Sequence, residues 1–538
     1  MSLNIKDSLK KYKGKIYHSY AIIESHREGK KMKHKYIMNV SHWTQSQRDA
    51  FVAGVRGKKL FSLDNVSCKS GKKIGALSVF YQLAEQLGVI HSMPNKSKVF
   101  PALLLIIGRI LTQGSRRHLM EWSKLQELKM VFGKEEFSLD TLYMTLDYLS
   151  EKQSEIEEKL FIKADKADKL FLYDVTSTYL EGQKNELAEY GYNRDKKRGK
   201  KQIVAGLLTN SEGMPVSIEA FKGNSQDLKT VSNQIKKLVE RFGAKKITLV
   251  GDRGMLKQPQ IDELISENFG YITAITKPQI KVLLNEKVIQ LGLFDEDVSE
   301  VEHSGIRYIL RRNPIRVNQL LKTREHKIEK INNQSAELSD YLTKHPRAKV
   351  EVSKAKLKRL IERSKLNDCV EILVDGRKLF VHLNQSRLDE ESQLYGCYVI
   401  KTNVSKEELS KEEVHQRYKD LSFVERAFRL LKTGCLEIRP VFVRLDKRTR
   451  GHIFATMLSY LLLREFWNRT KHLGMTLEHM IEVLDSVQTS ILQLEGSQSV
   501  KVIPEVSEEV QIILSALGMT LPLQKRRTGR CSTENKTS

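Results

Sequence analysis

The spacing of apolar residues changes along the chain and predicts a mixed α/β protein. Between about residues 75 and 165, apolar residues recur every three or four positions, which is the period of amphipathic helices. From Leu170 onward, short apolar runs alternate with turn-forming residues, which is typical of strands. Lys15–Ile23 and Lys35–Val40 alternate apolar and polar residues on either side of a polar turn, and they predict a small β-hairpin near the N-terminus.

The central run predicts a particular order of elements. Three strands form a meander: KLFLYDVTSTYLEG, IVAGLLTN and VSIEAFKGN. A basic turn at Tyr192–Lys201 precedes the second strand, and a turn at SEGMP precedes the third. A helix and a strand follow, DLKTVSNQIKKLVERFG and KITLVGDRGM, and then a second such pair, PQIDELISENFG and YITAITK. Three antiparallel strands followed by αβαβ is the order of an RNase H-like domain.

A long segment interrupts this domain. It holds weak strand patterns near 286–291 and 306–311, a highly charged helical region from Val317 to Lys365, and the hairpin CVEILVDGRKLFVHL with its Asp375-Gly376 turn. The charged helices would either follow a phosphate backbone, stay solvated or pair in a dimer, and the pattern leaves these options open.

The remaining segments are mainly helical in pattern. The run GHIFATMLSYLLLREF is apolar all round and predicts a buried helix. The runs MTLEHMIEVLDSVQTSILQLE and EVSEEVQIILSAL predict two amphipathic helices. The predicted parts, in chain order, are a small β-containing N-terminal region (1–60), a helical region that binds DNA or serves as scaffold (61–165), the first part of the RNase H-like domain (166–280), the mixed β/helical insertion (281–405), the second part of the domain (406–475), C-terminal helices (476–523) and a disordered basic tail (524–538).

The net charge of the chain indicates the class of its partner. Lys and Arg total 91 against 66 Asp and Glu, a formal net charge of +25, which favours a polyanion such as nucleic acid. The five cysteines form no close pair, so neither a disulfide framework nor a thiolate zinc site is indicated. The best apolar run, Phe100–Leu111, is short and interrupted by Arg109, so we expect a cytoplasmic protein without a membrane partner.

Three acids occupy positions that favour chemistry. Asp174 lies in the middle of an apolar strand, where a carboxylate is unfavourable unless it binds metal or pairs with a cation, so it is either catalytic or a satisfied structural acid. Asp252 follows the carboxyl end of a strand, where ligands of α/β sheets collect. Glu425 lies in Tyr418–Lys432, which predicts one helix with cations around this acid; the alternative is a surface helix with an ordinary Glu–Arg pair.

Carboxylates in this arrangement suit Mg²⁺ or Mn²⁺. Two such ions per active site, about 3.5–4 Å apart, would support in-line displacement at phosphorus. Neighbouring cations and one tyrosine would contact the DNA backbone, although Tyr418 and Lys432 have helix packing as an alternative role. The candidate DNA-binding residues are Tyr418, Arg426, Arg429, Lys432, Arg253, Arg194, Lys197, Arg198, Lys200 and Lys201. His452, beside an apolar helix, is expected to be a core or capping histidine.

Several of these motifs, in this order, resemble one family. YDVTSTYLE, GYNRDKKRGKKQIVAGLL, GMPVSIEAFKGNSQD, VGDRGM and YKDLSFVERAFRLLK…IRPVFV resemble the DDE transposases of bacterial insertion sequences. Within them the match is to the "IS four" superfamily and, closest, to its "IS sixteen-thirty-four" group. The resemblance covers about residues 165 to 520. It implies that Asp174, Asp252 and Glu425 are the catalytic metal ligands and that the insertion helps to handle transposon ends.

One position departs from the signature of that superfamily, which runs Tyr, two residues, Arg, three residues, Glu, six residues, Lys. Tyr418, Glu425 and Lys432 fit, but Leu421 stands at the Arg position. The phosphate contact of that Arg would then fall to Arg426 or Arg429.

The resemblance implies a DNA transposase that binds the terminal inverted repeats of its element and catalyses Mg-dependent strand cleavage and strand transfer. Its partners would be double-stranded DNA, from transposon ends and target, and a second copy of the chain in a synaptic complex, with no small-molecule substrate. The alternatives are an RNase H-like DNA nuclease without strand transfer and an inactive transposase-derived DNA-binding protein.

Overall fold

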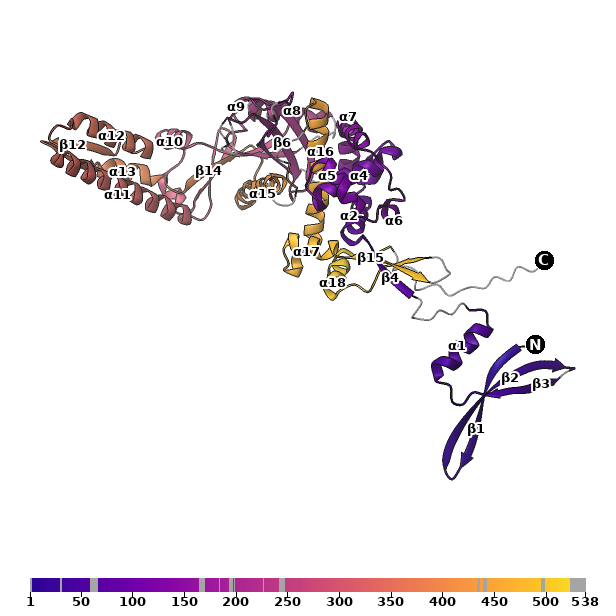
Figure 1. Cartoon of the computed structure of the whole chain (residues 1–538). Helices are drawn as coiled ribbons and strands as arrows, with labels where there is room; N and C mark the ends of the chain where they lie inside the picture. The colour runs from indigo at the N-terminus through magenta and orange to yellow at the C-terminus, as the bar shows by residue number, and fades with distance from the viewer. Residues whose placement is uncertain are drawn as a thin grey trace. The chain divides into compact units, whose positions relative to one another are not determined.

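The structure is a computed structural model, and the chain divides into two compact units (Figure 1). Unit 1 comprises Met1–Ile74, Asp485–Glu508 and Leu523–Ser538, and unit 2 comprises Gly75–Leu484 and Glu509–Pro522. The structure describes residues 2–29, 31–58, 66–163, 170–182, 184–192, 197, 199–225, 227–240, 247–432, 436–438, 443–494 and 499–522. The predicted basic tail at 524–538 lies outside the described residues.

Unit 1 begins with an antiparallel sheet in the order β1-β2-β3. Its strands are β1 (Ser2–Tyr12), β2 (Lys15–Glu28) and β3 (Lys31–Asn39). The predicted hairpin is confirmed as β2 and β3, and β1 is an additional strand that its polar sequence did not indicate. Helix α1 (Gln45–Val55) follows and is stabilised at its start by a capping box between Thr44 and Gln47.

A second small sheet in unit 1 corrects the expectation that 476–523 is helical throughout. Its strands are β4 (Val66–Lys73), β15 (Gln488–Leu494) and β16 (Val500–Val502), in the order β16-β15-β4. The helix predicted from MTLEHMIEVLDSVQTSILQLE ends at Asp485, and its second half is β15. Thr489 and Ile491 are β-branched and favour a strand once β4 supplies an edge to pair with. β4 also places a strand inside the region 61–165, which was expected to be helical.

The remainder of 61–165 is helical, as predicted. Its helices, all in unit 2, are α2 (Gly75–Gln86), α3 (Val89–Ser92), α4 (Lys96–Leu111), α5 (Arg116–Lys124), α6 (Leu128–Phe132) and α7 (Leu139–Lys163). Later in the chain come α16 (Asp446–Thr470), α17 (Leu477–Asp485) and α18 (Glu508–Leu517). The prediction of a buried helix is confirmed by α16, which packs against α4 and α7. Among the described residues no single helix is long and apolar enough to cross a membrane, although α4 and α5, bent by 90°, meet that test as a pair.

Gly451 allows α16 to approach α7 closely. A Cβ atom at this position would lie 1.9 Å from the backbone oxygen of Leu146, which cannot move aside without displacing α7. We therefore expect Gly451→Ala to lower the free energy of unfolding by about 2–3 kcal/mol, measured by urea denaturation of the full chain. Gly292→Ala, at a site with no heavy atom within 4 Å, is the control and should change it by less than about 0.5 kcal/mol. Equal stability of both variants would contradict the packing argument.

The central sheet of unit 2 has eight strands in the order β10-β11-β14-β9-β8-β5-β6-β7. The strands expected from the meander and from the two helix–strand pairs are β5 (Leu170–Tyr179), β6 (Gln202–Asn210), β7 (Pro215–Lys222), β8 (Thr248–Gly251) and β9 (Gly270–Ala274). The meander is confirmed, because β5, β6 and β7 are antiparallel neighbours. β8 runs parallel to both β5 and β9. The prediction of a mixed α/β protein is therefore confirmed.

Helices cover both faces of this sheet. α8 (Asp227–Glu240) and α9 (Gln258–Ser266) lie on one face, where Phe171, Tyr173 and Val175 of β5 join their apolar side chains in one core. α15 (Leu421–Lys432) packs on β5 and β6, and α16 packs on β7. Figure 1 shows α8 and α9 on one side of the strands and α15 on the other.

The insertion adds three strands to the central sheet. Near its start come α10 (Lys277–Asn285), the 3₁₀ turn η2 (Leu291–Phe294), and the strands β10 (Ser299–His303) and β11 (Ile306–Arg312). The third strand, β14 (Cys397–Thr402), lies near its end. β14 pairs with β9, and β11 pairs with β14, so these strands extend the central sheet. The strand predicted near 306–311 is confirmed as β11, whereas the one near 286–291 is wrong, because the strand next to β11 begins only at Ser299.

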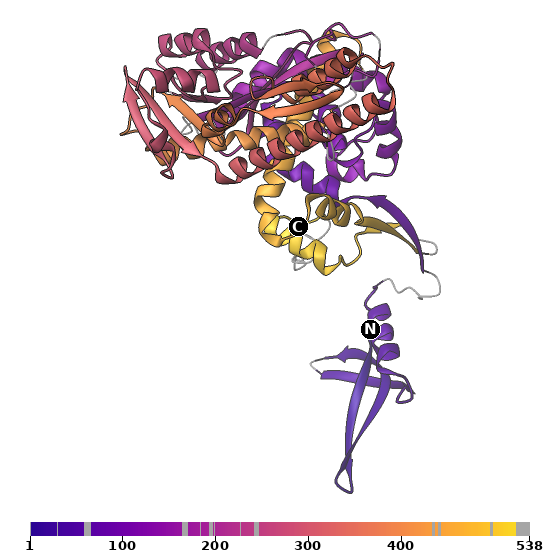
Figure 2. The same cartoon turned by 90° about the vertical axis from the view of Figure 1, so that its left-hand side faces the viewer.

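The rest of the insertion has an apolar core of its own, made by Ile331, Leu338, Leu357 and Leu379 among others. Its elements are α11 (Pro314–Lys344), α12 (Val350–Ser364), β12 (Val370–Asp375), β13 (Lys378–Leu383) and α13 (Gln385–Gln393). The predicted hairpin is confirmed, since Asp375 pairs with Lys378 across a tight turn in which Gly376 has φ +57°. Figure 2 gives a second view of this part.

The segment Tyr418–Lys432 forms two helices instead of the single helix expected. α14 (Lys411–Lys419) starts with a capping box between Ser410 and Glu413, and the chain breaks at Asp420 before α15 begins. The Asp420 carboxylate is nearly buried and accepts hydrogen bonds from Arg417 (3.0 Å) and Gln416 (3.1 Å). These bonds stabilise the side chain of Asp420 at the end of α14. Because the chain breaks at Asp420, Tyr418 lies on a different helix from Glu425.

Candidate carboxylate site

Asp174 lies on the sheet face opposite to α8 and α9. Side chains alternate along a strand, and its neighbours Tyr173 and Val175 face the core beneath those helices. The Asp174 side chain is half-buried, and its Oδ1 accepts a hydrogen bond from the backbone N–H of Val175 at 2.8 Å. The carboxylate is thus on the face that α15 covers.

Asp252 occupies the corresponding place on the neighbouring strand. β8 is parallel to β5, and Tyr173 is in register with Gly251, so the next residues of the two strands, Asp174 and Asp252, are adjacent in register. Asp252 is exposed and is followed by a turn. In this turn the backbone oxygen of Asp252 accepts a hydrogen bond from the N–H of Met255 (2.9 Å). Two carboxylates from distant segments are therefore brought next to each other in the middle of the sheet, where β8 ends.

Glu425 is the third predicted acid. It is exposed on α15, next to a buried stripe formed by Val424, Ala427, Phe428 and Leu431 that packs on the sheet. Within the described part of the chain, no three His, Cys, Asp or Glu side chains lie close enough together to hold a metal ion. The fold thus brings Glu425 to the face of Asp174, but the three carboxylates are not gathered into a finished metal site.

Tyr418 connects this region to a buried polar cluster that the sequence did not reveal. Its hydroxyl lies 3.4 Å from Oδ1 of Asp252 and donates to it. Burial, and then the Asp252 carboxylate, raise the pKa of Tyr418 above its usual range. Tyr398 of β14 also acts on that pKa, and its own hydroxyl is hydrogen-bonded to Nε2 of His415.

His415 lies beneath Tyr418 on the same face of α14, three positions earlier. Its ring is buried, and Nη1 of Arg311 donates to it, 3.1 Å from Nε2. Burial, with Arg311 and Lys419 nearby, lowers the pKa of His415 to about 4, so the ring is neutral at pH 7. The spacing of His415 and Tyr418 is the one sequence signal that could have indicated this cluster.

The predicted DNA-binding cations are spread over two elements and a loop. Arg253 is exposed beside Asp252, and Arg426 and Arg429 are exposed on α15, where Lys432 is half-buried. Arg426 lies near enough to the buried Tyr460 of α16 to influence its pKa.

The lysines between β5 and β6 have partners within the chain. Lys200 forms an ion pair with Glu181 (3.0 Å). Lys197 lies over the ring of Tyr179 and Lys201 over that of Tyr190. These contacts are on the surface and weak enough to exchange for a phosphate. The other two predicted cations of this loop, Arg194 and Arg198, lie outside the described residues.

His452 is a core histidine, as expected. It is buried on α16, and burial together with Arg116 and Arg109 lowers its pKa well below the ordinary value. Burial also lowers the pKa of Arg109 to about 9 and that of Arg116 to about 10. Arg116 is therefore part of the interior of the helical region, and Arg109 is half-buried beside it.

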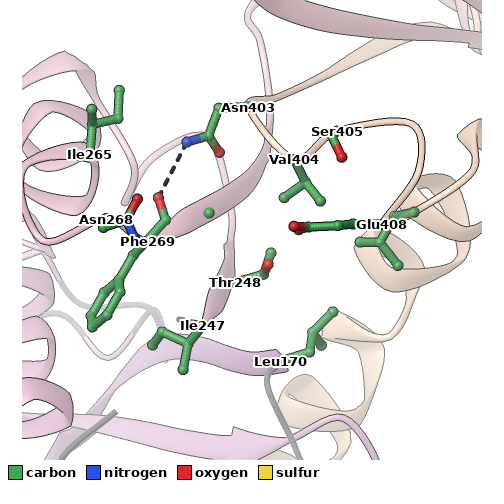
Figure 3. A pocket seen from close by; sticks show the side chains of 12 residues that line it. Leu170, Ile247, Thr248, Ile265, Asn268, Phe269, Asn403, Val404, Ser405 and Glu408 are labelled. Carbon is green, nitrogen blue, oxygen red and sulfur yellow. Dashed lines mark hydrogen bonds between the residues drawn. The ribbon is translucent and has the colours of Figure 1, made fainter. Parts of the chain in front are cut away.

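A cavity of about 480 Å³ lies at the other end of the same strands (Figure 3). Leu170 and Thr248, which begin β5 and β8, line it, so it is separated from Asp174 and Asp252 by the length of the strands. Its walls are partly polar and partly apolar, and the Asn403 amide, which donates to the backbone oxygen of Phe269 (3.2 Å), stabilises one side. This cavity does not contribute to the carboxylate site.

Comparison with known proteins defines the family. The sequence model described as "Transposase DDE domain" matches residues 165–462, more than half of the chain. The chain therefore belongs to the DDE transposases. A second model, described as "IS1634 family transposase, N-terminal domain", matches residues 5–61, and it makes this an IS1634-type member of that family.

Two further comparisons complete these findings. The chain is similar to the piggyBac transposase in a cryo-EM structure of its synaptic complex with hairpin DNA, with 8% identity, a TM-score of 0.36 and coverage of 76% of this chain and 78% of that chain. Comparison with the curated proteins gives no match.

Proposed function

We propose that this transposase binds the terminal inverted repeats of its own insertion sequence, cleaves the strands there and joins the freed 3′-OH ends to target DNA. The observation that supports this most directly is the pair of aspartates at corresponding places on neighbouring parallel strands, beneath a helix that carries Glu425. The order of the antiparallel meander and the parallel strands β8 and β9 further supports an RNase H-like arrangement of the domain.

The proposed site uses only hard oxygen ligands. Asp174, Asp252 and Glu425 would hold two Mg²⁺ or Mn²⁺ ions, and three carboxylates fit these cations. When bound, the ions would supply Lewis-acid activation of the attacking oxygen and stabilisation of the leaving oxygen. Because the three carboxylates are not gathered in this structure, the proposal requires α15 or the turn after β8 to shift when DNA binds.

The cations around the acids have a separate proposed role. Arg253 would contact the phosphates beside Asp252, and Arg426, Arg429 and Lys432 would do so beside Glu425, which orients the scissile strand. Two copies of the chain would act together on double-stranded DNA in a synaptic complex, in the bacterial cytoplasm.

One experiment separates this function from its alternatives. Purified protein is mixed with Mg²⁺, a plasmid and a labelled duplex that carries the inverted repeat flanking its gene, and the products are separated by size. Cleaved and joined products are expected. Cleavage without joining would instead support a nuclease, and binding without cleavage would support a DNA-binding protein that has lost its activity.

Tyr418→Phe is expected to reduce cleavage about 10-fold while leaving stability nearly unchanged. The hydroxyl that donates to Asp252 is lost, and groups that orient a metal ligand typically change activity by about 10–100-fold. The loss should shrink at high Mg²⁺, which a Mg²⁺ titration of the cleavage rate measures. The control is Tyr341→Phe in the insertion, whose exposed ring stacks on His345. A defect in Tyr418→Phe that is independent of Mg²⁺ would contradict the orienting role.

A further inference from the structure

The N-terminal sheet carries a two-stranded arm that the described residues of its own unit do not cover. β1 pairs with β2 along the whole length of β1, from Ser2 to Tyr12, but β3 pairs with β2 only from Ala21 to Glu28. Residues 8–19 therefore form a hairpin of two strands, here called the arm, and each of its side chains is exposed. Figures 1 and 2 show the end of this hairpin pointing away from the end of the β2–β3 hairpin.

The base of the same sheet is stabilised by packing, and the arm is not. Ile22, Ile23 and Val40 are buried at the base, and the Arg48 guanidinium of α1 lies 3.8 Å from the ring centroid of Tyr20. On the arm, large apolar side chains remain in water. They are Leu9 (67% exposed), Tyr12 (59%), Ile16 (58%) and Tyr17 (53%). Two strands with both faces in water are only marginally stable, so these side chains indicate a binding surface.

The charge of the arm identifies the chemistry of its partner. It carries Lys10, Lys11, Lys13 and Lys15 and no acid. The nearest acid, Asp7, already lies 3.0 Å from His18. A second copy of the arm would bring lysine against lysine, whereas a polyanion would neutralise all four.

Cations and apolar groups alternate across the arm. Lys10 is paired with Tyr17, Lys11 with Ile16, and Lys15 with Tyr12, so both faces present a cation beside a ring or a branched chain. Lys13 and Gly14 form the two-residue turn, both with positive φ (48° and 76°), and this places another cation at the tip. Basic groups with interleaved rings can contact phosphates and base edges together.

The dimensions favour duplex DNA. Five residue pairs at about 3.3 Å each make the arm about 17 Å long. The major groove of B-DNA is about 12 Å wide and admits a two-stranded β-ribbon. We propose that residues 8–19 enter the major groove of the terminal inverted repeat and supply a large part of this transposase's affinity for transposon ends. This inference rests on the proposed function, and it names the surface by which the chain recognises its DNA.

The test compares two full-length variants with the same loss of charge. The arm variant changes Lys10, Lys11, Lys13 and Lys15 to Gln. The control changes to Gln four exposed lysines that lie outside the arm, the insertion and the candidate DNA-binding residues, namely Lys222, Lys236, Lys277 and Lys471. Affinity for a labelled inverted-repeat duplex and for a scrambled duplex is measured by fluorescence anisotropy at several salt concentrations. Circular dichroism confirms that both variants are folded.

The arm variant is expected to lose about 30–100-fold in affinity at 0.15 M salt, and the slope of log K against log[salt] should fall by about 3–4, since each phosphate contact contributes about 0.9. Tyr12→Ala/Tyr17→Ala should reduce the preference for the inverted repeat over the scrambled duplex. Equal losses of DNA affinity in the arm and control variants would overturn the proposal. Unchanged DNA affinity in the arm variant would overturn it too. This holds even if the arm variant loses binding to phosphatidylserine vesicles, because the partner of the arm would then be a membrane surface.

The same measurements distinguish this inference from the proposed function. If the wild-type protein neither binds nor cleaves the inverted repeat, the proposed function itself fails. If the wild type binds and cleaves while the arm variant binds equally well, only the role of the arm is overturned. At protein concentrations that restore binding, the arm variant should cleave at the wild-type rate, because Asp174, Asp252 and Glu425 are intact.

Discussion

Alanine at Asp174, Asp252 or Glu425 is expected to reduce cleavage of the inverted repeat by at least about 10³-fold while leaving the protein able to bind it. In the proposed site each carboxylate would supply oxygen ligands to cations that stabilise several kcal/mol of developing charge at phosphorus, and about 1.4 kcal/mol corresponds to a factor of ten in rate. The change is measured as the initial rate of strand cleavage at saturating DNA.

The matched controls are exposed acids on the opposite face of the sheet. Asp262 lies on α9 and Glu267 directly follows that helix, so neither can reach the face that carries Asp174. Alanine at either position should leave cleavage within about two-fold of the wild type. A variant of Asp174 or Asp252 that retains full activity would refute the assignment of that residue, and loss of DNA binding together with cleavage would indicate misfolding instead.

The elements of the central domain could be predicted because their signals are local. In β5, β6 and β7 each strand is an apolar run bounded by a turn, and consecutive strands pair with one another. The same holds for the hairpin at Asp375-Gly376. Motif spacing then placed Asp174 on one strand and Asp252 directly after another, and the structure pairs these two strands, β5 and β8, in parallel up to Tyr173 and Gly251.

Elements that depend on distant partners could not be predicted. Gln488–Leu494 has an apolar pattern that suits an amphipathic helix or a short strand, and it becomes β15 by pairing with β4, where Ser70 and Gln488 are 418 positions apart. β10 and β11 likewise extend the central sheet from within the insertion. A single sequence carries no signal for pairings of this kind.

In the candidate site, too, local features could be predicted from the sequence, and contacts between distant residues could not. The positions of the acids follow from motifs, but the contact of Tyr418 with Asp252 joins residues 166 positions apart and depends on the break at Asp420. No glycine or proline marks that break, and the nearly buried carboxylate at it accepts hydrogen bonds from Arg417 and Gln416. A helical pattern continues on both sides, so the sequence predicts one helix.

Lys237→Met is expected to lower the free energy of unfolding by about 3–5 kcal/mol, because it removes the cation from a buried network at the edge of the sheet. Glu157 of α7 is completely buried, and its Oε2 accepts from Ser217 of β7 (3.0 Å). Lys237 of α8 donates to Ser217 (3.0 Å) and lies 3.2 Å from Glu219 and 4.0 Å from Glu157. The network therefore joins the helical region to the central sheet through three elements.

Glu157→Gln should be much milder, with a loss of about 1 kcal/mol, because burial already raises the pKa of Glu157 and the neutral amide keeps an oxygen for Ser217 or Ile218. The double variant Glu157→Gln/Lys237→Met should be more stable than Lys237→Met alone, since less uncompensated charge remains buried. Urea denaturation of the full chain measures all three variants. Lys344→Met, which breaks an exposed pair with Asp340, is the control and should cost less than about 0.5 kcal/mol. If Lys237→Met were no more harmful than this control, the cation would be dispensable, and apolar packing alone would account for the contact between α7 and β7.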